Sequence, residues 1–438
     1  MLRNLLRALL GVIIVAIVLI VGFWLWARQP SIAAIAPPDA STFDKATIAR
    51  GANLVAMGDC ATCHNSPEGH PFAGGFPVPT PFGIIYGTNI TPDPDTGIGR
   101  WSEQAFARAM HRGIRRDGAY LYPAFPYTHF TKVSDDDIKA IYAYLMTRPA
   151  VHNVVPAPRL PFPLNIRPIM AGWNLLFFRP GRFVPDPAKS EAWNRGAYIA
   201  EGLAHCGACH TPRNLLGAEK TSERYAGGEA EGWFAPALGA RSSAPVQWSE
   251  AALLNYLSAG FARDHGVAAG PMAGVTRDLR KLPASDLTAL ATYFASLAPP
   301  APARETMGAA STDKASYQIA TAQAMGQKGP AKTGEAIFAG ACASCHFEGG
   351  SQPFHRPIRL RLSSAVTAPT PRNFIQIVLG GIQPPPGDHG RWMPPFANAL
   401  TDEQVSLLAQ YVRGHFSGKP DWSDIGKTVA QVRKGSGS

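Results

Sequence analysis

The sequence has 438 residues, of which 46% are hydrophobic and 16% are charged, with 40 prolines and 43 glycines. This length corresponds to about three domains of ~150 residues each, and the abundant proline and glycine predict compact helical domains with long irregular loops. The net charge of +10 comes from basic residues scattered along the chain. This distribution excludes the clustered basic surface that a nucleic-acid-binding protein needs.

The first predicted element is an uncharged apolar run over residues 8–27, preceded by two arginines and closed by Arg28. Twenty such residues can cross a bilayer, whereas the apolar core of a signal peptide is usually about 7 to 15 residues long. We therefore predict a membrane anchor over residues 1–28, although the small residues at 33–36 leave a cleavage site open. The two arginines before the run favour an N-terminus on the inner side of the membrane.

Three copies of the pattern Cys-x-x-Cys-His follow, and they contain every cysteine of the sequence. The residues are Cys60, Cys63 and His64; Cys206, Cys209 and His210; and Cys342, Cys345 and His346. Two thiols one helical turn apart can form thioethers with the vinyl groups of a haem, and the adjacent histidine then binds the iron. Zinc sites and thioredoxin-like pairs also use Cys-x-x-Cys, but neither requires a histidine directly afterwards in three places. The pattern therefore predicts three covalently bound haem c groups.

The repeated motif sets the domain organisation. We predict a mostly α fold, in which an N-terminal transmembrane helix is followed by three class I cytochrome c domains with long irregular loops. The predicted segments are the anchor 1–28, cytochrome c domain 43–148, Pro-rich linker 149–187, domain 188–298, linker 299–331, domain 332–418 and C-terminal tail 419–438. Haem attachment is expected on the oxidising side of a bacterial inner membrane, so these domains are predicted to lie in the periplasm.

Helical patterns recur at matching places in the repeats. An amphipathic helix is predicted to open at Trp101-Ser102-Glu103 and end near Gly113. Its counterpart is predicted to open at Trp248-Ser249-Glu250 and end near Gly260. Each repeat then closes with apolar residues spaced i, i+3, i+4, which predict helices over 137–144, 286–293 and 403–411.

A class I cytochrome c domain places its distal iron ligand, usually a methionine, on a loop between these helices. Met272 and Met393 occupy this place in the second and third repeats. In the first repeat the matching position is Phe125, which cannot bind iron, so we predict His129 as the distal ligand, with Met110 as the alternative. A bis-histidine haem would have a lower potential than the two His/Met haems.

The sequence resembles the triple-haem cytochrome c subunits of periplasmic membrane-bound dehydrogenases over nearly the whole chain. Besides the three motifs, the matching segments are 89–93, 97–99, 101–102, 121–124 and 270–273. Members of this family serve PQQ alcohol dehydrogenases, flavin-dependent gluconate or fructose dehydrogenases, or molybdenum hydroxylases that oxidise aldehydes or N-heterocycles such as nicotinate. The loop with Phe125 and His129, together with segments 160–167 and 171–174, looks most like the cytochromes paired with molybdenum hydroxylases.

The resemblance implies an electron-transfer subunit in a respiratory chain. Electrons would come from a catalytic dehydrogenase subunit, accompanied by a [2Fe-2S] subunit, and pass to ubiquinone, a terminal oxidase or a soluble cytochrome. No proton-transfer dyad or nucleophile arrangement is recognisable in the sequence, so no residue is predicted to be catalytic. A self-contained haem enzyme such as a peroxidase is the alternative, and it would need an open axial position at the first haem.

Overall fold

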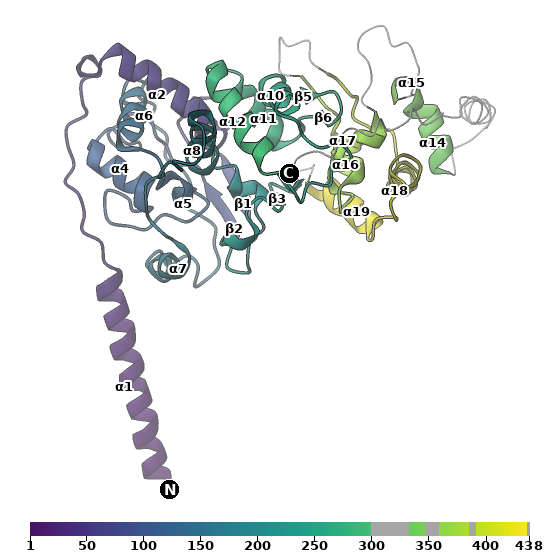
Figure 1. Cartoon of the computed structure of the whole chain (residues 1–438). Coiled ribbons are helices and arrows are strands. Elements are labelled where there is room, and N and C mark those ends of the chain that lie inside the picture. Colours follow the sequence, from purple (N-terminus) through teal and green to yellow (C-terminus); the bar gives the residue numbers. More distant parts are fainter. Residues whose placement is uncertain (299–332, 347–358, 385–390, 436–438) are drawn as a thin grey trace. The chain divides into compact units, whose positions relative to one another are not determined.

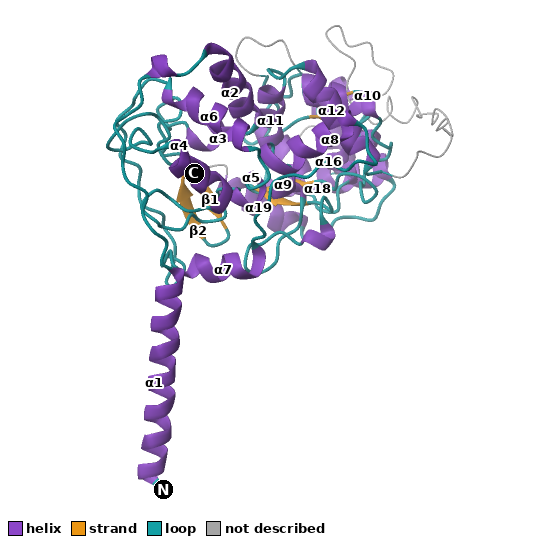
Figure 2. Cartoon of the chain, turned by 60° about the vertical axis from the view of Figure 1, so that its left-hand side comes forward, coloured by secondary structure: helices purple, strands orange, loops and turns teal. Residues whose placement is uncertain are grey.

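The computed structural model describes residues 1–298, 333–346, 359–384 and 391–435 (Figure 1). The predicted linker 299–331 lies outside these residues. The chain divides into two compact units, Met1–Pro187 with Tyr198–His205, and Ala188–Ala197 with Cys206–Ser438. Helices dominate the described residues, and their strands form only two-stranded antiparallel hairpins (Figure 2). The predicted mostly helical fold is confirmed.

The first unit begins with α1 (Leu2–Ala27), which starts six residues before the apolar run used to predict it. Its most apolar window has a mean hydropathy of 3.0 and contains no buried residue. Among the described residues, α1 is the one helix that is long and apolar enough to span a membrane. The helix ends at Arg28, whose backbone is extended. Pro30 follows two residues later, and proline cannot continue a helix because it lacks the backbone donor.

Three pairs of crossing helices organise the rest of the chain, one pair for each Cys-x-x-Cys-His motif. The pairs are α2 (Lys45–Met57) with α6 (Asp135–Met146), α8 (Glu191–Tyr198) with α12 (Ala284–Ser296), and α14 (Gly334–Ala341) with α18 (Asp402–Val412). In each pair the first helix precedes a motif and the second is the closing helix predicted from the apolar spacing.

A glycine lies at the crossing point of every pair. A Cβ atom on Gly51 would lie 2.0 Å from the carbonyl oxygen of Ala140, one on Gly196 would lie 2.0 Å from that of Ala289, and one on Gly334 would lie 2.1 Å from that of Leu407. Because the obstacle is backbone in each case, it cannot move aside as a side chain could. Only glycine allows the helices to approach this closely.

Salt bridges accompany two of these crossings. Arg50 donates to Asp137 in the first pair at 2.8 Å. In the second pair Arg195 donates to both carboxylate oxygens of Asp286, at 2.7 and 3.0 Å. In the third pair the residue before the crossing glycine is Thr333, and its side chain caps α14 instead.

The remaining elements of the first unit connect α1, the first motif and the segment that carries His129. They are η1 (Ala40–Thr42), α3 (Cys60–His64), β1 (Pro77–Thr80), β2 (Gly83–Tyr86), α4 (Glu103–Arg112), α5 (Tyr127–Phe130), α7 (Ile169–Phe177) and the π-helical turn η2 (Ile199–Leu203). The predicted Pro-rich linker 149–187 thus contains a helix, α7.

The second unit contains the other two motifs. Its remaining elements are α9 (Gly207–His210), η3 (Thr221–Glu223), β3 (Gly228–Ala230), β4 (Trp233–Ala235), α10 (Glu250–Ala259), β5 (Phe261–Ala262), β6 (Gly266–Val267), α11 (Pro271–Leu279), α15 (Ala343–His346), η4 (Leu360–Leu362), α16 (Ser364–Thr367), α17 (Arg372–Gly380), η5 (Arg413–Ser417) and α19 (Ile425–Gly435).

The two helices predicted from the Trp-Ser-Glu pattern are confirmed as α4 and α10. The Ser102 side chain accepts a hydrogen bond from the third residue of α4, and Ser249 does the same for α10. Gly113 and Gly260 end these helices with φ of 63° and 69°. Serine at the N-cap and left-handed glycine after the last turn are local signals, which is why the sequence located both helices.

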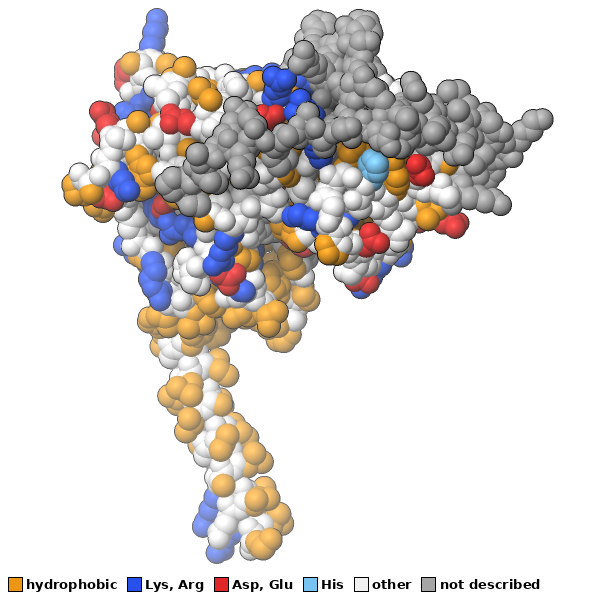
Figure 3. All heavy atoms as spheres, turned by 45° about the vertical axis from the view of Figure 1, so that its right-hand side comes forward, with side chains coloured by type: hydrophobic (Ala, Val, Ile, Leu, Met, Phe, Trp, Pro, Cys, Tyr) orange, Lys and Arg blue, Asp and Glu red, His pale blue; other side chains and the backbone are white. Residues whose placement is uncertain are grey.

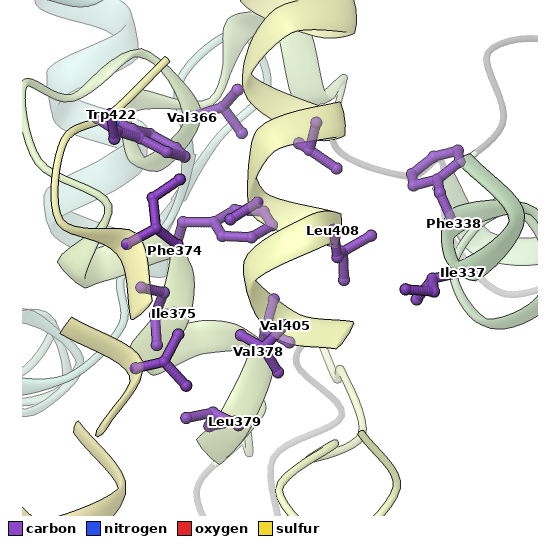
Figure 4. Close-up of a cluster of buried hydrophobic side chains, with 14 of the residues drawn as sticks. Ile337, Phe338, Val366, Phe374, Ile375, Val378, Leu379, Val405, Leu408 and Trp422 are labelled. Carbon is purple, nitrogen blue, oxygen red and sulfur yellow. The ribbon is translucent and has the colours of Figure 1, made fainter. Parts of the chain in front are cut away.

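The hydrophobic core around α18 shows how the third helix pair is held together (Figure 4). Leu408 of α18 faces α14 on one side, where Ile337 and Phe338 are buried, and α17 lies on the other side with Phe374. Trp422, from the predicted C-terminal tail, is also buried in this cluster and donates to the carbonyl oxygen of Ala368. Each such side chain contributes about 1.5–3 kcal/mol when fully buried.

Candidate functional site

Each Cys-x-x-Cys-His motif folds into a short helical turn, α3, α9 or α15. Side chains three residues apart lie on one face of a helix, so the two thiols of each motif point the same way and the histidine follows them. Burial raises the pKa of the Cys206 thiol to about 12 and that of Cys342 to about 11, so both are neutral at physiological pH.

The histidines of the first two motifs are oriented by backbone carbonyl groups. His64 Nδ1 donates to the carbonyl oxygen of Thr88, and His210 Nδ1 donates to that of Pro236, both at 2.6 Å. A carbonyl oxygen can only accept, so the proton is on Nδ1 and the lone pair is on Nε2. Burial lowers the pKa of both imidazoles, which keeps them neutral. A neutral ring with its Nδ1–H anchored in this way is the usual state of a histidine that binds a metal through Nε2.

Small β-hairpins supply these two carbonyl groups. Thr88 follows the hairpin β1–β2, and Pro236 follows the hairpin β3–β4. The first hairpin lies directly against its motif, because a Cβ on Gly87 would lie 1.6 Å from the carbonyl oxygen of Cys63. In the second repeat a Cβ on Gly228 would lie 2.4 Å from that of Cys209. These hairpins were not predicted from the sequence. Their local signal is a short apolar run that follows a glycine with positive φ, Gly83 in the first hairpin and Gly232 in the second.

The donor set of each motif fits covalently attached haem c. Two thiols on one face of a turn can form the two thioether bonds, and the following histidine supplies one axial nitrogen. In the first two motifs the carbonyl partner of Nδ1 is also in place. For the third, residues 347–358 after His346 lie outside the described part of the chain.

Met272 lies in the first turn of α11, not in a loop as expected. Pro271 stands at the start of this helix, where its fixed φ and missing donor are tolerated. The preceding Gly270 has φ of 55°, and a Cβ there would lie 2.3 Å from the indole of Trp233. Trp233 belongs to β4, the strand that leads to the carbonyl partner of His210, so Met272 and His210 are positioned by the same hairpin.

Met393 is half-buried and packs against the core of the third helix pair. Its backbone forms two hydrogen bonds with Ile382, at 2.9 and 3.0 Å, which hold the segment extended. Residues 385–390, just before it, lie outside the described residues. Distal ligation by Met272 and Met393 stays a prediction.

His129 is buried on the short helix α5, not on an open loop. Its Nδ1 donates to the carbonyl oxygen of Glu201 at 3.0 Å, the type of bond that His64 and His210 make. Nε2 is therefore the nitrogen that ligation would use. The alternative ligand, Met110, is buried in α4, and Phe125 stacks edge-on against Phe130.

The neighbour of Met110, His111, is engaged through both ring nitrogens. Its Nε2 donates to the carbonyl oxygen of Val133 at 3.0 Å, and its Nδ1 accepts from Arg182 at 2.6 Å. Burial, together with the guanidinium of Arg182, lowers the pKa of His111 to about 4. This histidine is thus a neutral structural residue.

The segment 198–205, which precedes the second motif in the chain, packs onto α5 within the first unit. The ring of His205 lies 6.5 Å from that of His129 and 5.6 Å from that of Phe130. Lys132 also forms a salt bridge with Glu201 at 2.6 Å. This cluster could not be predicted from the sequence, because no local pattern relates residues ~70 positions apart.

Two family models match the sequence. The model described as "Cytochrome c" matches residues 48–149, and the model described as "Cytochrome C oxidase, cbb3-type, subunit III" matches residues 329–412. The two matches cover the first and third motifs.

Three relatives match along most of this chain. A nicotinate dehydrogenase subunit of Pseudomonas putida is 46% identical over 94% of the chain, but the match covers only 34% of that relative, so the chain spans about a third of its length. The fructose dehydrogenase cytochrome subunit of Gluconobacter japonicus is 36% identical, with 91% of this chain and 85% of the relative covered. The gluconate 2-dehydrogenase cytochrome c subunit of Pantoea cypripedii is 36% identical, with 92% of each covered.

Proposed function

Because the chain belongs to the family of cytochrome c subunits of dehydrogenase complexes, whose domains hold covalent haem c, we propose that it carries electrons through three such haems. They would travel from a periplasmic catalytic subunit to ubiquinone or to another respiratory acceptor, a terminal oxidase or a soluble cytochrome. The observation that carries the proposal is the threefold occurrence of a Cys-x-x-Cys-His turn beside a glycine-centred helix crossing. Bound haem supplies reversible one-electron transfer, and the residues of this chain hold and orient it.

The proposed number of three haems depends on the second repeat, which neither family model covers. Its crossing at Gly196 matches those at Gly51 and Gly334 to within 0.1 Å in the distance to the facing carbonyl oxygen. Its motif histidine, His210, is held by a carbonyl group as His64 is. The same local structure therefore supports the same cofactor at all three motifs.

The axial ligands follow the same reasoning. We assign His64, His210 and His346 as the proximal ligands, and Met272 and Met393 as distal ligands of the second and third haems. For the first haem we assign His129, supported by its burial and by its Nδ1–H bond to Glu201. A second nitrogen ligand in place of a thioether favours ferric iron and lowers the potential.

The partner that we propose is a molybdenum hydroxylase oxidising an aldehyde or an N-heterocycle, with a [2Fe-2S] subunit. The similarity to the nicotinate dehydrogenase subunit, at 46% identity, supports this branch. The second candidate is a flavin or PQQ dehydrogenase, and it is supported by the fructose and gluconate dehydrogenase subunits, which match this chain over most of their own length. In both cases the substrate would bind to the catalytic partner.

Helix α1 would anchor the subunit in the bacterial inner membrane with the haem-binding parts in the periplasm. Its length and the exposure of nearly all its side chains support this role, because an exposed apolar helix needs a lipid environment.

The haem number can be tested by measuring haem per chain in the purified protein after alkaline pyridine treatment. Three haems are expected, and two in the double variant Cys206→Ala/Cys209→Ala. A ratio of two in the unmodified protein, unchanged in this variant, would contradict haem binding at the second motif. A Ser344→Ala variant, which keeps both cysteines of its motif, is the matched control.

The partner can be tested by purifying the subunit from solubilised membranes and identifying the accompanying proteins and metals. Molybdenum with a [2Fe-2S] protein would support the hydroxylase branch. A flavin or PQQ protein would replace it with the second candidate and leave the electron-transfer role in place. Purification without any partner would contradict the role as a dehydrogenase subunit.

A further inference from the structure

Helix α7 is apolar on both its inner and its outer face. Met170 and Ala171 are buried in a cluster with Ala27, the last residue of α1. On the other face, Leu175 and Leu176 are 65% and 60% exposed. A helix of a soluble domain normally turns polar residues outward, and one that is apolar all round is normally covered on every side.

The one polar side chain of α7 is turned inward. Asn174 accepts a hydrogen bond from the hydroxyl of Tyr127 at 2.6 Å. Because this amide oxygen is used inside the domain, it does not make the outer face any more polar. The outer face is therefore suited to an apolar or interfacial surrounding.

Helix α7 lies across the point where α1 enters the body of the first unit (Figure 2). A Cβ on Gly172 would lie 3.8 Å from the ring of Phe23, in the last turns of α1. The two helices also enclose an apolar groove, lined by Leu19, Ile20, Phe23, Trp24, Ile166, Pro168 and Ile169. The space-filling view shows hydrophobic side chains gathered on this end of the body, around the base of the apolar helix (Figure 3).

The segment of the chain that contains α7 carries charges of one sign. Between residues 151 and 185 the sequence contains four arginines and no acidic residue. Arg179 is exposed just after α7 and donates to the carbonyl oxygens of Leu175 and Phe178, and Arg28 is exposed at the end of α1. Exposed leucines beside arginines and tryptophans are typical of helices that lie in a membrane interface, where anionic headgroups attract the basic residues.

We propose that α7 lies in the interface between the headgroups and acyl chains of the membrane and forms a second membrane contact beside α1. Leu175 and Leu176 would enter the acyl region, and Arg179 would remain among the headgroups. The lipid bilayer would cover this surface, because the surface continues directly from the last turns of α1. This inference rests on α1 being the membrane anchor, as proposed above.

The contact would restrict how the first unit can tilt about the end of α1. A single helix followed by an extended segment leaves that tilt open, whereas two contacts packed together fix one face of the unit toward the membrane.

The test is photo-crosslinking in the full-length, haem-containing protein reconstituted into vesicles of phosphatidylethanolamine and phosphatidylglycerol. A photoreactive p-benzoylphenylalanine replaces Leu175 or Leu176, and separately Leu10 within α1 and Leu215 in the second unit, which is 96% exposed. After irradiation, lipid adducts on each variant are quantified by mass spectrometry. Haem content and circular dichroism of each variant establish that it is folded.

We expect lipid adducts at Leu175 and Leu176 in yields similar to that at Leu10 and about tenfold above that at Leu215, as for residues seated below the headgroups. Adducts at Leu10 without adducts at the two α7 positions would overturn this inference and leave the anchor standing. Absence of adducts at Leu10 as well would overturn the anchor and the inference together. Crosslinks from α7 to another polypeptide in place of lipid would overturn it in favour of a protein interface.

Discussion

Replacing Gly334 with alanine tests whether the helix crossings hold the haem-binding parts together. The new Cβ would lie 2.1 Å from the carbonyl oxygen of Leu407 and 2.7 Å from the Cβ of Tyr411. Ordinary contacts begin near ~3.5 Å, so α14 would have to move about 1.4 Å away from α18. This movement would also loosen the packing of Ile337 and Phe338 on Leu408 (Figure 4).

Gly334→Ala should lower the free energy of unfolding by about 3 kcal/mol before any compensation. This is the upper end of the range for overpacking, because the obstacle is backbone. Alanine regains at most about 1 kcal/mol through its higher helix propensity, because Gly334 is the first residue of α14 and not an interior residue. The net loss of about 2 kcal/mol corresponds to a decrease in Tm of roughly 8–16 °C for a domain of ~90 residues.

Differential scanning calorimetry of the full-length protein would measure this shift in the transition of the third helix pair. Gly340 of the same helix is the matched control, because a Cβ there would meet nothing within 4 Å. Gly340→Ala should leave Tm unchanged or raise it. If Gly334→Ala were as stable as Gly340→Ala, the reasoning that backbone contact requires glycine at the crossing would be refuted.

Three further predictions concern single side chains. His111 has its pKa lowered to about 4 by burial and Arg182, so the folded state binds fewer protons than the unfolded state between pH 6.5 and 4. Its contribution to stability should be complete above pH 6.5 and fall by on the order of 2 kcal/mol by pH 5; denaturant midpoints at the two pH values, compared with those of His111→Gln, would measure this. His129→Met should raise the lowest haem potential by on the order of 100 mV, and a redox titration with an unchanged lowest potential would exclude His129 as a ligand. Gly270→Ala, which would force a Cβ against Trp233, should weaken the sulfur-to-iron charge-transfer absorption of one haem, while Gly426→Ala, in open space, should not.

Helices whose limits are fixed by local signals were predictable from the sequence. Ser102 and Gly113 bracket α4 because a serine side chain satisfies the first free N–H groups and a glycine accepts positive φ after the last turn. The resemblance to dehydrogenase cytochrome subunits, which rested on motifs of the same local kind, is confirmed by the relatives. The start of α11 at Pro271 was missed, because its glycine and proline were assigned to a loop and the contact that fixes Gly270 comes from Trp233.

In the candidate site, too, features set by neighbouring residues were predictable and features set by tertiary contacts were not. The motif itself determines where each thiol and its histidine stand, because all of them lie within five consecutive residues. The sequence could not indicate that Thr88 and Pro236 would orient His64 and His210, since these partners come from hairpins about 25 residues further along the chain.

By itself, then, the sequence determined the three Cys-x-x-Cys-His motifs, the long apolar run near the N-terminus and the helices with local caps, all of which depend on residues close together in the chain. Only the tertiary structure decided which backbone atoms meet these residues. It placed glycines at the helix crossings, Glu201 beside His129, and α7 beside the end of α1. These contacts join distant segments, and they follow from close packing, which no local pattern encodes.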